Sequence, residues 1–119
     1  MKKVFHRTIS LRRNEVVNMS EKIKEVENKY IANSDYVLRE IVGEYMLIPT
    51  GKLSMTANGV VTISESAAYL WKKMDEGKSM SQLCDLLLEE YEVDRDTALS
   101  DISEMIDGML KTEAVKRQL

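Results

Sequence analysis

The spacing of apolar residues changes once along the chain, at Ser64. Before it, short apolar runs separated by glycine turns predict extended strands at 36–42, 45–49 and 60–63. After it, apolar residues recur every three or four positions up to about residue 112, which predicts helices. The order of strands first and helices second favours a small binding module.

Glycine-containing turns are expected to join the strands. Gly43-Glu44 suits a type II′ hairpin between the first two strands, because glycine tolerates the positive φ of the first turn position. Asn58-Gly59 is the dipeptide that best fits a tight turn before the third strand. The segment 53–57 between these turns is weakly strand-like.

Three helix starts follow from capping signals. Ser64 is a candidate N-cap for a helix that ends near Gly77, and Ser79 with Gln82 has the form of a capping box. Asp94 is a candidate cap for a third helix that runs to about Thr112.

The third helix has a wide apolar surface made of two adjacent rows. Either one row faces the core while the other borders a groove, or the helix buries both. The two rows are Ala98, Ile102, Met105 and Met109, and Leu99, Ile106 and Leu110.

The flanks of this region carry less pattern. Residues 1–34 are expected to form an N-terminal extension, which is either loosely packed or contains a short amphipathic helix at 20–32, and Met19 is a second candidate start. Residues 35–112 are expected to form the domain, and residues 113–119 a C-terminal tail. Oligomeric state is left open.

Charge is unevenly distributed along the chain. Residues 1–34 contain eight Lys/Arg and four Glu, a net charge of +4, whereas residues 79–113 contain two Lys/Arg and ten Asp/Glu, a net charge of −8. Nucleic-acid binding requires Lys and Arg side chains that neutralise phosphates, so an acidic helical half is expected to repel nucleic acid.

The chain offers little for catalysis. His6 is the single histidine, so no multi-histidine metal site can form, and Cys84 lies in an apolar helical stripe where a buried thiol is expected. We therefore expect no enzyme activity, no catalytic residue, no metal and no cofactor. No apolar run approaches the roughly 20 residues that span a bilayer, and the N-terminus lacks the apolar core of a signal peptide. A cytoplasmic location and no membrane partner are expected.

Two motifs carry a family resemblance. L-R-E-I-x-G-E-Y-x-L-x-P-x-G at 38–51, followed by N-G-x-V-x-I-S-E-S-A-A-Y-L-W at 58–71, resembles the pyrroloquinoline quinone biosynthesis protein D (PqqD) family, and the resemblance extends from Tyr36 to about Lys111. It implies an α+β, winged-helix-like fold in which a three-stranded antiparallel sheet precedes a three-helix bundle. It also implies a RiPP recognition element, which binds the leader of a ribosomally made precursor peptide.

The resemblance further implies how the peptide binds and which kind of enzyme is the partner. The leader adds as a strand beside the third strand and contacts the third helix, and a modifying enzyme, commonly a radical S-adenosylmethionine (SAM) enzyme, is the partner. Replacing Ile106 or Leu110 by Asp is expected to weaken leader binding without unfolding the domain. The peptide-binding residues expected from this mapping are Val60, Val61, Thr62, Ile63, Leu99, Ile102, Ser103, Ile106 and Leu110.

Two other functions compete with this interpretation. A winged helix can bind nucleic acid, although the charge argues against it here, and a module of this kind can also assemble proteins without a peptide substrate. Binding at two salt concentrations separates these functions, since DNA binding falls steeply with salt and strand addition falls much less.

Overall fold

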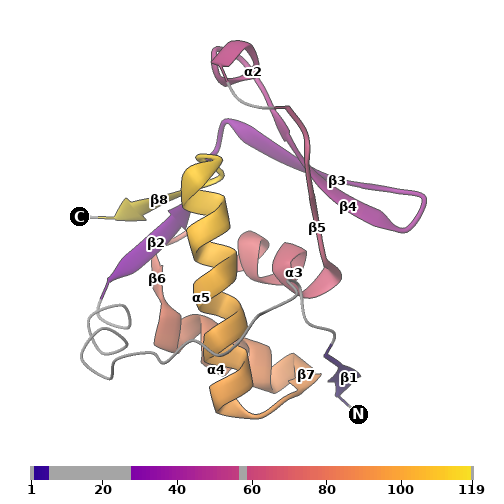
Figure 1. Cartoon of the computed structure of the whole chain (residues 1–119), viewed down its shortest axis with the longest axis vertical. Coiled ribbons are helices and arrows are strands. Elements are labelled where there is room, and N and C mark those ends of the chain that lie inside the picture. Colours follow the sequence, from indigo (N-terminus) through magenta and orange to yellow (C-terminus); the bar gives the residue numbers. More distant parts are fainter. Residues whose placement is uncertain (1, 6–27, 57–58, 119) are drawn as a thin grey trace.

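The computed structural model describes residues 2–5, 28–56 and 59–118, which contain three small sheets and four helices (Figure 1). The elements in chain order are β1 (Lys3–Val4), β2 (Lys29–Ala32), β3 (Tyr36–Ile41), β4 (Glu44–Pro49), α2 (Leu53–Thr56), β5 (Val61–Ile63), α3 (Glu65–Lys73), β6 (Lys78–Ser79), α4 (Met80–Glu90), β7 (Tyr91–Glu92), α5 (Arg95–Lys111) and β8 (Val115–Gln118).

The expected α+β fold is confirmed. Strands β3, β4 and β5 form an antiparallel sheet in that order, and α3, α4 and α5 follow it along the chain. Residues 53–56 form the short helix α2, not the weak strand expected there. Asn58 lies outside the described residues, but Gly59 has the positive φ of 95° that the expected turn requires.

The β3–β4 hairpin turns one residue earlier than expected. Ile41 pairs with Glu44, so the two central residues are Val42 and Gly43. Both have positive φ, 51° and 79°, which is the signature of a type I′ turn and not of the expected type II′ turn. Val42 is 96% exposed and β-branched, and such a residue is strained at positive φ.

Replacing Val42 by Asn should stabilise the protein. Asn-Gly is the preferred type I′ dipeptide, so we expect the free energy of unfolding to rise by about 1 kcal/mol, measured by urea denaturation. Val42→Thr is the matched control, because it makes the position polar but keeps the β-branch. Equal stability of the Asn and Thr variants would contradict a backbone origin of the effect.

The helices begin at the expected caps. The Ser64 hydroxyl accepts a hydrogen bond from the Ala67 N–H at 3.1 Å, and Ser79 and Gln82 form a reciprocal capping box with distances of 3.1 and 2.8 Å. Asp94 accepts from the Thr97 N–H at 3.4 Å. Each bond satisfies a backbone donor that the first helical turn leaves unpaired.

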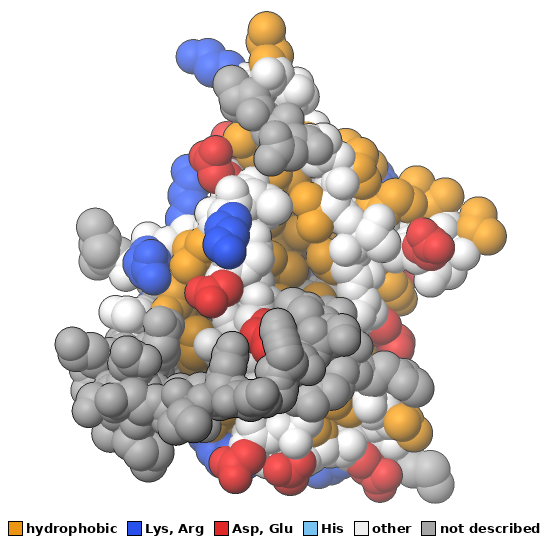
Figure 2. Space-filling model, in the orientation of Figure 1, with side chains coloured by type: hydrophobic (Ala, Val, Ile, Leu, Met, Phe, Trp, Pro, Cys, Tyr) orange, Lys and Arg blue, Asp and Glu red, His pale blue; other side chains and the backbone are white. Residues whose placement is uncertain are grey.

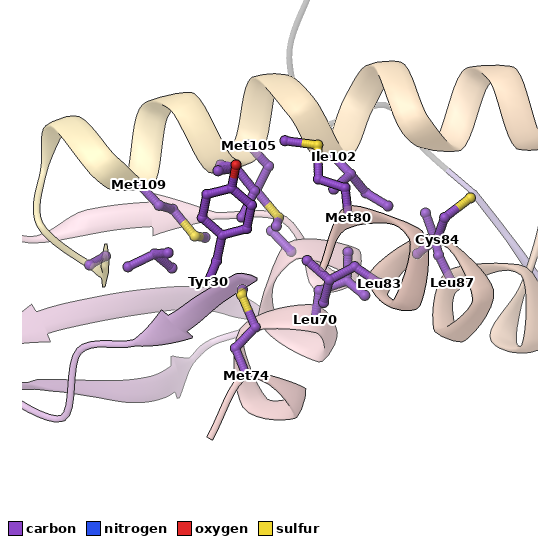
Figure 3. Packing of buried hydrophobic residues seen from close by; sticks show 14 of the residues in the cluster. Tyr30, Leu70, Met74, Met80, Leu83, Cys84, Leu87, Ile102, Met105 and Met109 are labelled. Atoms are coloured by element: carbon purple, nitrogen blue, oxygen red, sulfur yellow. The ribbon is translucent and has the colours of Figure 1, made fainter. Parts of the chain in front are cut away.

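The core lies where α3, α4 and α5 meet β2 and β8 (Figures 1 and 3). It is rich in methionine, whose flexible side chain fills irregular space. Figure 3 shows Met74, Met105 and Met109 together with Tyr30, which is 0% exposed. The fully buried Leu70, Leu83 and Leu87 continue the cluster between α3 and α4.

Both flanks of the expected domain contribute strands. Residues 29–32 form β2, where part of an amphipathic helix was expected, and residues 115–118 form β8 instead of a tail. β2 lies between β6 and β8 and pairs antiparallel with both. The remainder of the expected helix, residues 20–27, lies outside the described residues, as do His6 and Met19.

Within the described ranges, no helix combines the length and apolar character needed to cross a membrane.

Candidate functional site

Strand β5 forms an open edge of its sheet within the described part of the chain. β4 pairs with β3 on one side and β5 on the other, and β5 has no further neighbour there. Figure 1 shows this sheet extending away from the helices, with β5 on the side of α5. An open edge of this kind presents backbone N–H and C=O groups to an incoming strand.

The register identifies the outward-facing backbone groups. A two-residue turn makes Ile41 and Glu44 a hydrogen-bonded pair, and hydrogen bonding alternates along an antiparallel ladder. Tyr45 therefore bonds Ile63 across the β4–β5 ladder, and Leu47 bonds Val61. The N–H and C=O of Thr62, between those two pairs, consequently point to the open edge.

An apolar crevice lies beside the first turn of α3, which starts two residues after β5 ends. We call it the α3–α5 crevice. The Phe5 side chain is part of its wall, and the remaining space is about 10 Å³, which is at the limit for one water molecule. Its lining residues are Phe5, Ser66, Ala67, Leu70, Leu87, Asp101, Ile102 and Met105.

Apolar side chains continue across the surface between α5 and β5 (Figure 2). Val61 and Ile63 are half-buried and pack against the core, as does Leu38 from β3. Val60, just before β5, is 53% exposed. The strand edge is thus bordered by surface that apolar side chains of a peptide can cover.

The structure places the expected site residues in different environments. Val60 and Thr62 are exposed, and Val61 and Ile63 are half-buried along β5. Leu99, Ser103 and Leu110 are half-buried on α5, whereas Ile102 and Ile106 are each 1% exposed. Of the expected α5 residues, only Ile102 lines the α3–α5 crevice.

The burial of Ile106 contradicts one expectation from the sequence. An Asp at this position was expected to weaken binding and leave the fold intact. A side chain that is 1% exposed belongs to the core, and a carboxylate there carries a large desolvation cost. The mutation therefore tests folding and not peptide binding.

Sequence reasoning missed the residues that α3 and the N-terminus add to the site. Ser66 and Ala67 are 5% and 1% exposed, and they line the α3–α5 crevice together with Phe5. Small residues in the first turn of α3 were a visible signal. Phe5 could not have been found, because nothing in the sequence relates it to α3.

Two buried groups of the helical half, Tyr91 and Cys84, have raised pKa values. Burial, followed by the nearby Glu65 and Glu90 charges, raises the pKa of Tyr91 to about 12. Burial also raises the pKa of the Cys84 thiol, against the lowering effect of Arg95. Neither group is activated for acid–base or nucleophilic chemistry near neutral pH. Among the described residues, no group of three or more His, Cys, Asp or Glu side chains is arranged to hold a metal.

A solved structure shares this fold. TbiB1, in complex with the TbiA(beta) leader peptide, matches with a TM-score of 0.58 and 21% identity, over 72% of this chain and 94% of the TbiB1 chain. At this identity the match shows the fold, which is a small α+β domain of the winged-helix-like class.

The sequence identifies the family within this class. The model of the family "Coenzyme PQQ synthesis protein D (PqqD)" matches residues 44–115, and the chain belongs to this family. The resemblance seen in the motifs at 38–51 and 58–71 is thereby confirmed. A search of curated proteins gave no match.

Proposed function

We propose that this protein is a RiPP recognition element that binds the leader of a precursor peptide by strand addition to β5. The observation that carries the proposal is the outward-facing backbone of Thr62 at an open edge beside apolar surface. An extended peptide gains affinity from backbone hydrogen bonds to such an edge, and pockets for alternate side chains give specificity. TbiB1, which shares the fold, was solved with a leader peptide.

The peptide-binding residues follow from this arrangement. On β5 they are Val60, Val61, Thr62 and Ile63, with Thr62 giving its backbone and the others giving apolar surface. On α5 we propose that the accessible side chains of Leu99, Ser103 and Leu110 contact the leader. Ile102 contacts a leader side chain that lies in the α3–α5 crevice. Ile106 acts by supporting α5 from within the core.

The protein acts by presenting the leader to a modifying enzyme and is not itself a catalyst. The raised pKa values of Tyr91 and Cys84 support this role, because neither group is activated near neutral pH. A radical SAM enzyme is the proposed partner, in line with the family resemblance. We expect the genes next to the coding sequence to encode the candidate precursor and enzyme.

Nucleic-acid binding is the competing function, and charge disfavours it. Residues 79–113, which carry a net charge of −8, include all of α4 and α5 and with them the helical side of the proposed site. Binding of a duplex requires neutralisation of phosphates by Lys and Arg and weakens steeply with salt. Raising salt from 50 to 200 mM should change leader affinity little.

Replacing Thr62 by Pro should weaken leader binding by roughly 10- to 100-fold. Proline removes the outward N–H, and one or two lost backbone hydrogen bonds at about 1.4 kcal/mol each correspond to that range. Because the Thr62 N–H points away from β4, the β4–β5 ladder is retained. The measurement is a fluorescence-anisotropy titration with the labelled leader of the neighbouring precursor.

Thr62→Val is the matched control for this variant. It keeps the backbone N–H and the β-branch, so it should bind the leader within about twofold of the wild type. Loss of binding in both variants would place the specificity in the side chain, and unchanged binding in the Pro variant would exclude strand addition at β5. A leader that fails to bind the wild-type protein would refute the proposed function.

A further inference from the structure

Residues Lys3 to Phe5 dock on the helical half of the molecule as a short strand. Lys3 pairs with Tyr91 and Val4 with Glu92, so that β1 runs parallel to β7. Figure 1 shows this strand beside β7, at the end of the molecule where α4 lies. A strand of two residues makes a small contact, and the side chain of one of them, Val4, is 67% exposed.

The side chains of Lys3 and Phe5 provide the specific contacts. The Phe5 ring meets the edge of Tyr91, with centroids 6.0 Å apart, and also lines the α3–α5 crevice. The Lys3 Nζ lies 3.4 Å from a Glu65 carboxylate oxygen and 5.8 Å from the centre of the Tyr91 ring. Both residues therefore face Tyr91, as expected for positions two apart in a strand.

These contacts lie next to the proposed leader site. Glu65 is the first residue of α3 and follows Ile63 of β5 by two positions. Ser66 and Ala67, in the same turn, line the α3–α5 crevice together with Phe5. An extended peptide that passes along β5 toward α3 therefore reaches the space that Phe5 occupies.

We propose that Lys3–Phe5 occupies one end of the leader site in cis, and that the leader displaces it by placing its own large apolar side chain in the α3–α5 crevice. This inference rests on the proposed function and specifies the ligand. The leader that fits carries a basic residue two positions before an aromatic or large aliphatic residue, the spacing of Lys3 and Phe5.

Charge and strength of attachment both suit a displaceable segment. Residues 1–34 carry +4 and residues 79–113 carry −8, which favours docking of the N-terminus in cis. The Lys3–Glu65 pair is more than half exposed on both sides, so water and salt screen it. Attachment through the chain raises the effective concentration of the segment, so a leader must compete with it.

The test uses a fluorescein-labelled synthetic peptide with the sequence of residues 1–10, MKKVFHRTIS. It is titrated against the full-length wild type, Phe5→Ala and Val4→Ala. Phe5→Ala should bind the peptide about tenfold more tightly than the wild type, because its crevice is no longer filled in cis. Val4→Ala should behave as the wild type, since the Val4 side chain is mostly exposed. A labelled peptide carrying Phe5→Ala should not bind any of the three proteins.

A second measurement locates the binding. The Met105 methyl group lies in the crevice wall, and its NMR signal, assigned with Met105→Leu, should shift both in Phe5→Ala and when the peptide is added to that variant. Equal peptide affinity of wild type and Phe5→Ala, or equal binding of the peptide that lacks Phe5, would overturn the inference.

The two proposals fail in different ways. The peptide titration contains no leader, so its outcome does not depend on whether the protein binds one. If the leader binds through Thr62 but with equal affinity in wild type and Phe5→Ala, the autoinhibitory contact is wrong and the proposed function stands. If the leader binds no variant while the 1–10 peptide distinguishes them, the proposed function is wrong.

Discussion

Replacing Ile106 by Asp is expected to abolish folding. The side chain is 1% exposed in the core, so the change removes buried apolar surface and places a carboxyl group in its stead. The expected loss exceeds about 4 kcal/mol, which is most of the stability of a small domain. Circular dichroism with urea titration should show no cooperative transition.

Ser103→Asp is the matched control for this variant. It introduces the same side chain on the same helix, one turn earlier, at a half-buried polar position. We expect the free energy of unfolding to change by less than about 1 kcal/mol, and leader affinity to fall if α5 contributes to the site as proposed. A folded Ile106→Asp protein would show that α5 is rotated relative to the packing described above.

Removing residues 1–34 is expected to prevent folding. The deletion eliminates β2, which joins β6 to β8, and with it Tyr30, whose side chain is 0% exposed. Loss of a buried aromatic side chain alone costs about 3–5 kcal/mol. It also removes Asn33, whose side-chain amide donates to the Glu113 carbonyl oxygen at 2.8 Å and so ties the residue after β2 to the segment that follows α5.

Deleting only residues 1–27 is the control, because it removes β1 and keeps β2. This shorter variant should unfold cooperatively in a thermal melt, with a modest loss from the missing Phe5 contacts. Full stability of the chain that begins at Asp35 would contradict the role of β2. On this basis we propose that the folding unit comprises residues 28–118, a larger unit than the 35–112 expected from the sequence.

The helices were predictable because their signals are local. Ser64, Ser79 and Asp94 each cap the next helix within three residues, and the structure has all three bonds. The antiparallel pairing of β3 with β4 was equally local. Such features depend on a few neighbouring residues and not on the rest of the fold.

The wrong predictions concern residues whose structure depends on partners far away in the sequence. Residues 29–32 have no strand signal of their own and become β2 because β8, more than 80 positions away, pairs with them. The side of α5 that faces the crevice depends on how α3 packs across α5. The sequence therefore placed Met105 in one of the two apolar rows of the helix but could not show that it lines the crevice. At the hairpin, the strands' pairing placed Val42 at positive φ although glycine seemed the better residue to open the turn.

The sheet β6–β2–β8 has a consequence for synthesis of the protein. Its central strand is made early, and one of its two neighbours, β8, contains residues 115–118. Residues 115–118 must therefore leave the ribosome before Tyr30 can enter its final environment. Until then β2 has an unpaired edge and an uncovered aromatic side chain. Both features favour aggregation of the nascent chain, which chaperones counteract.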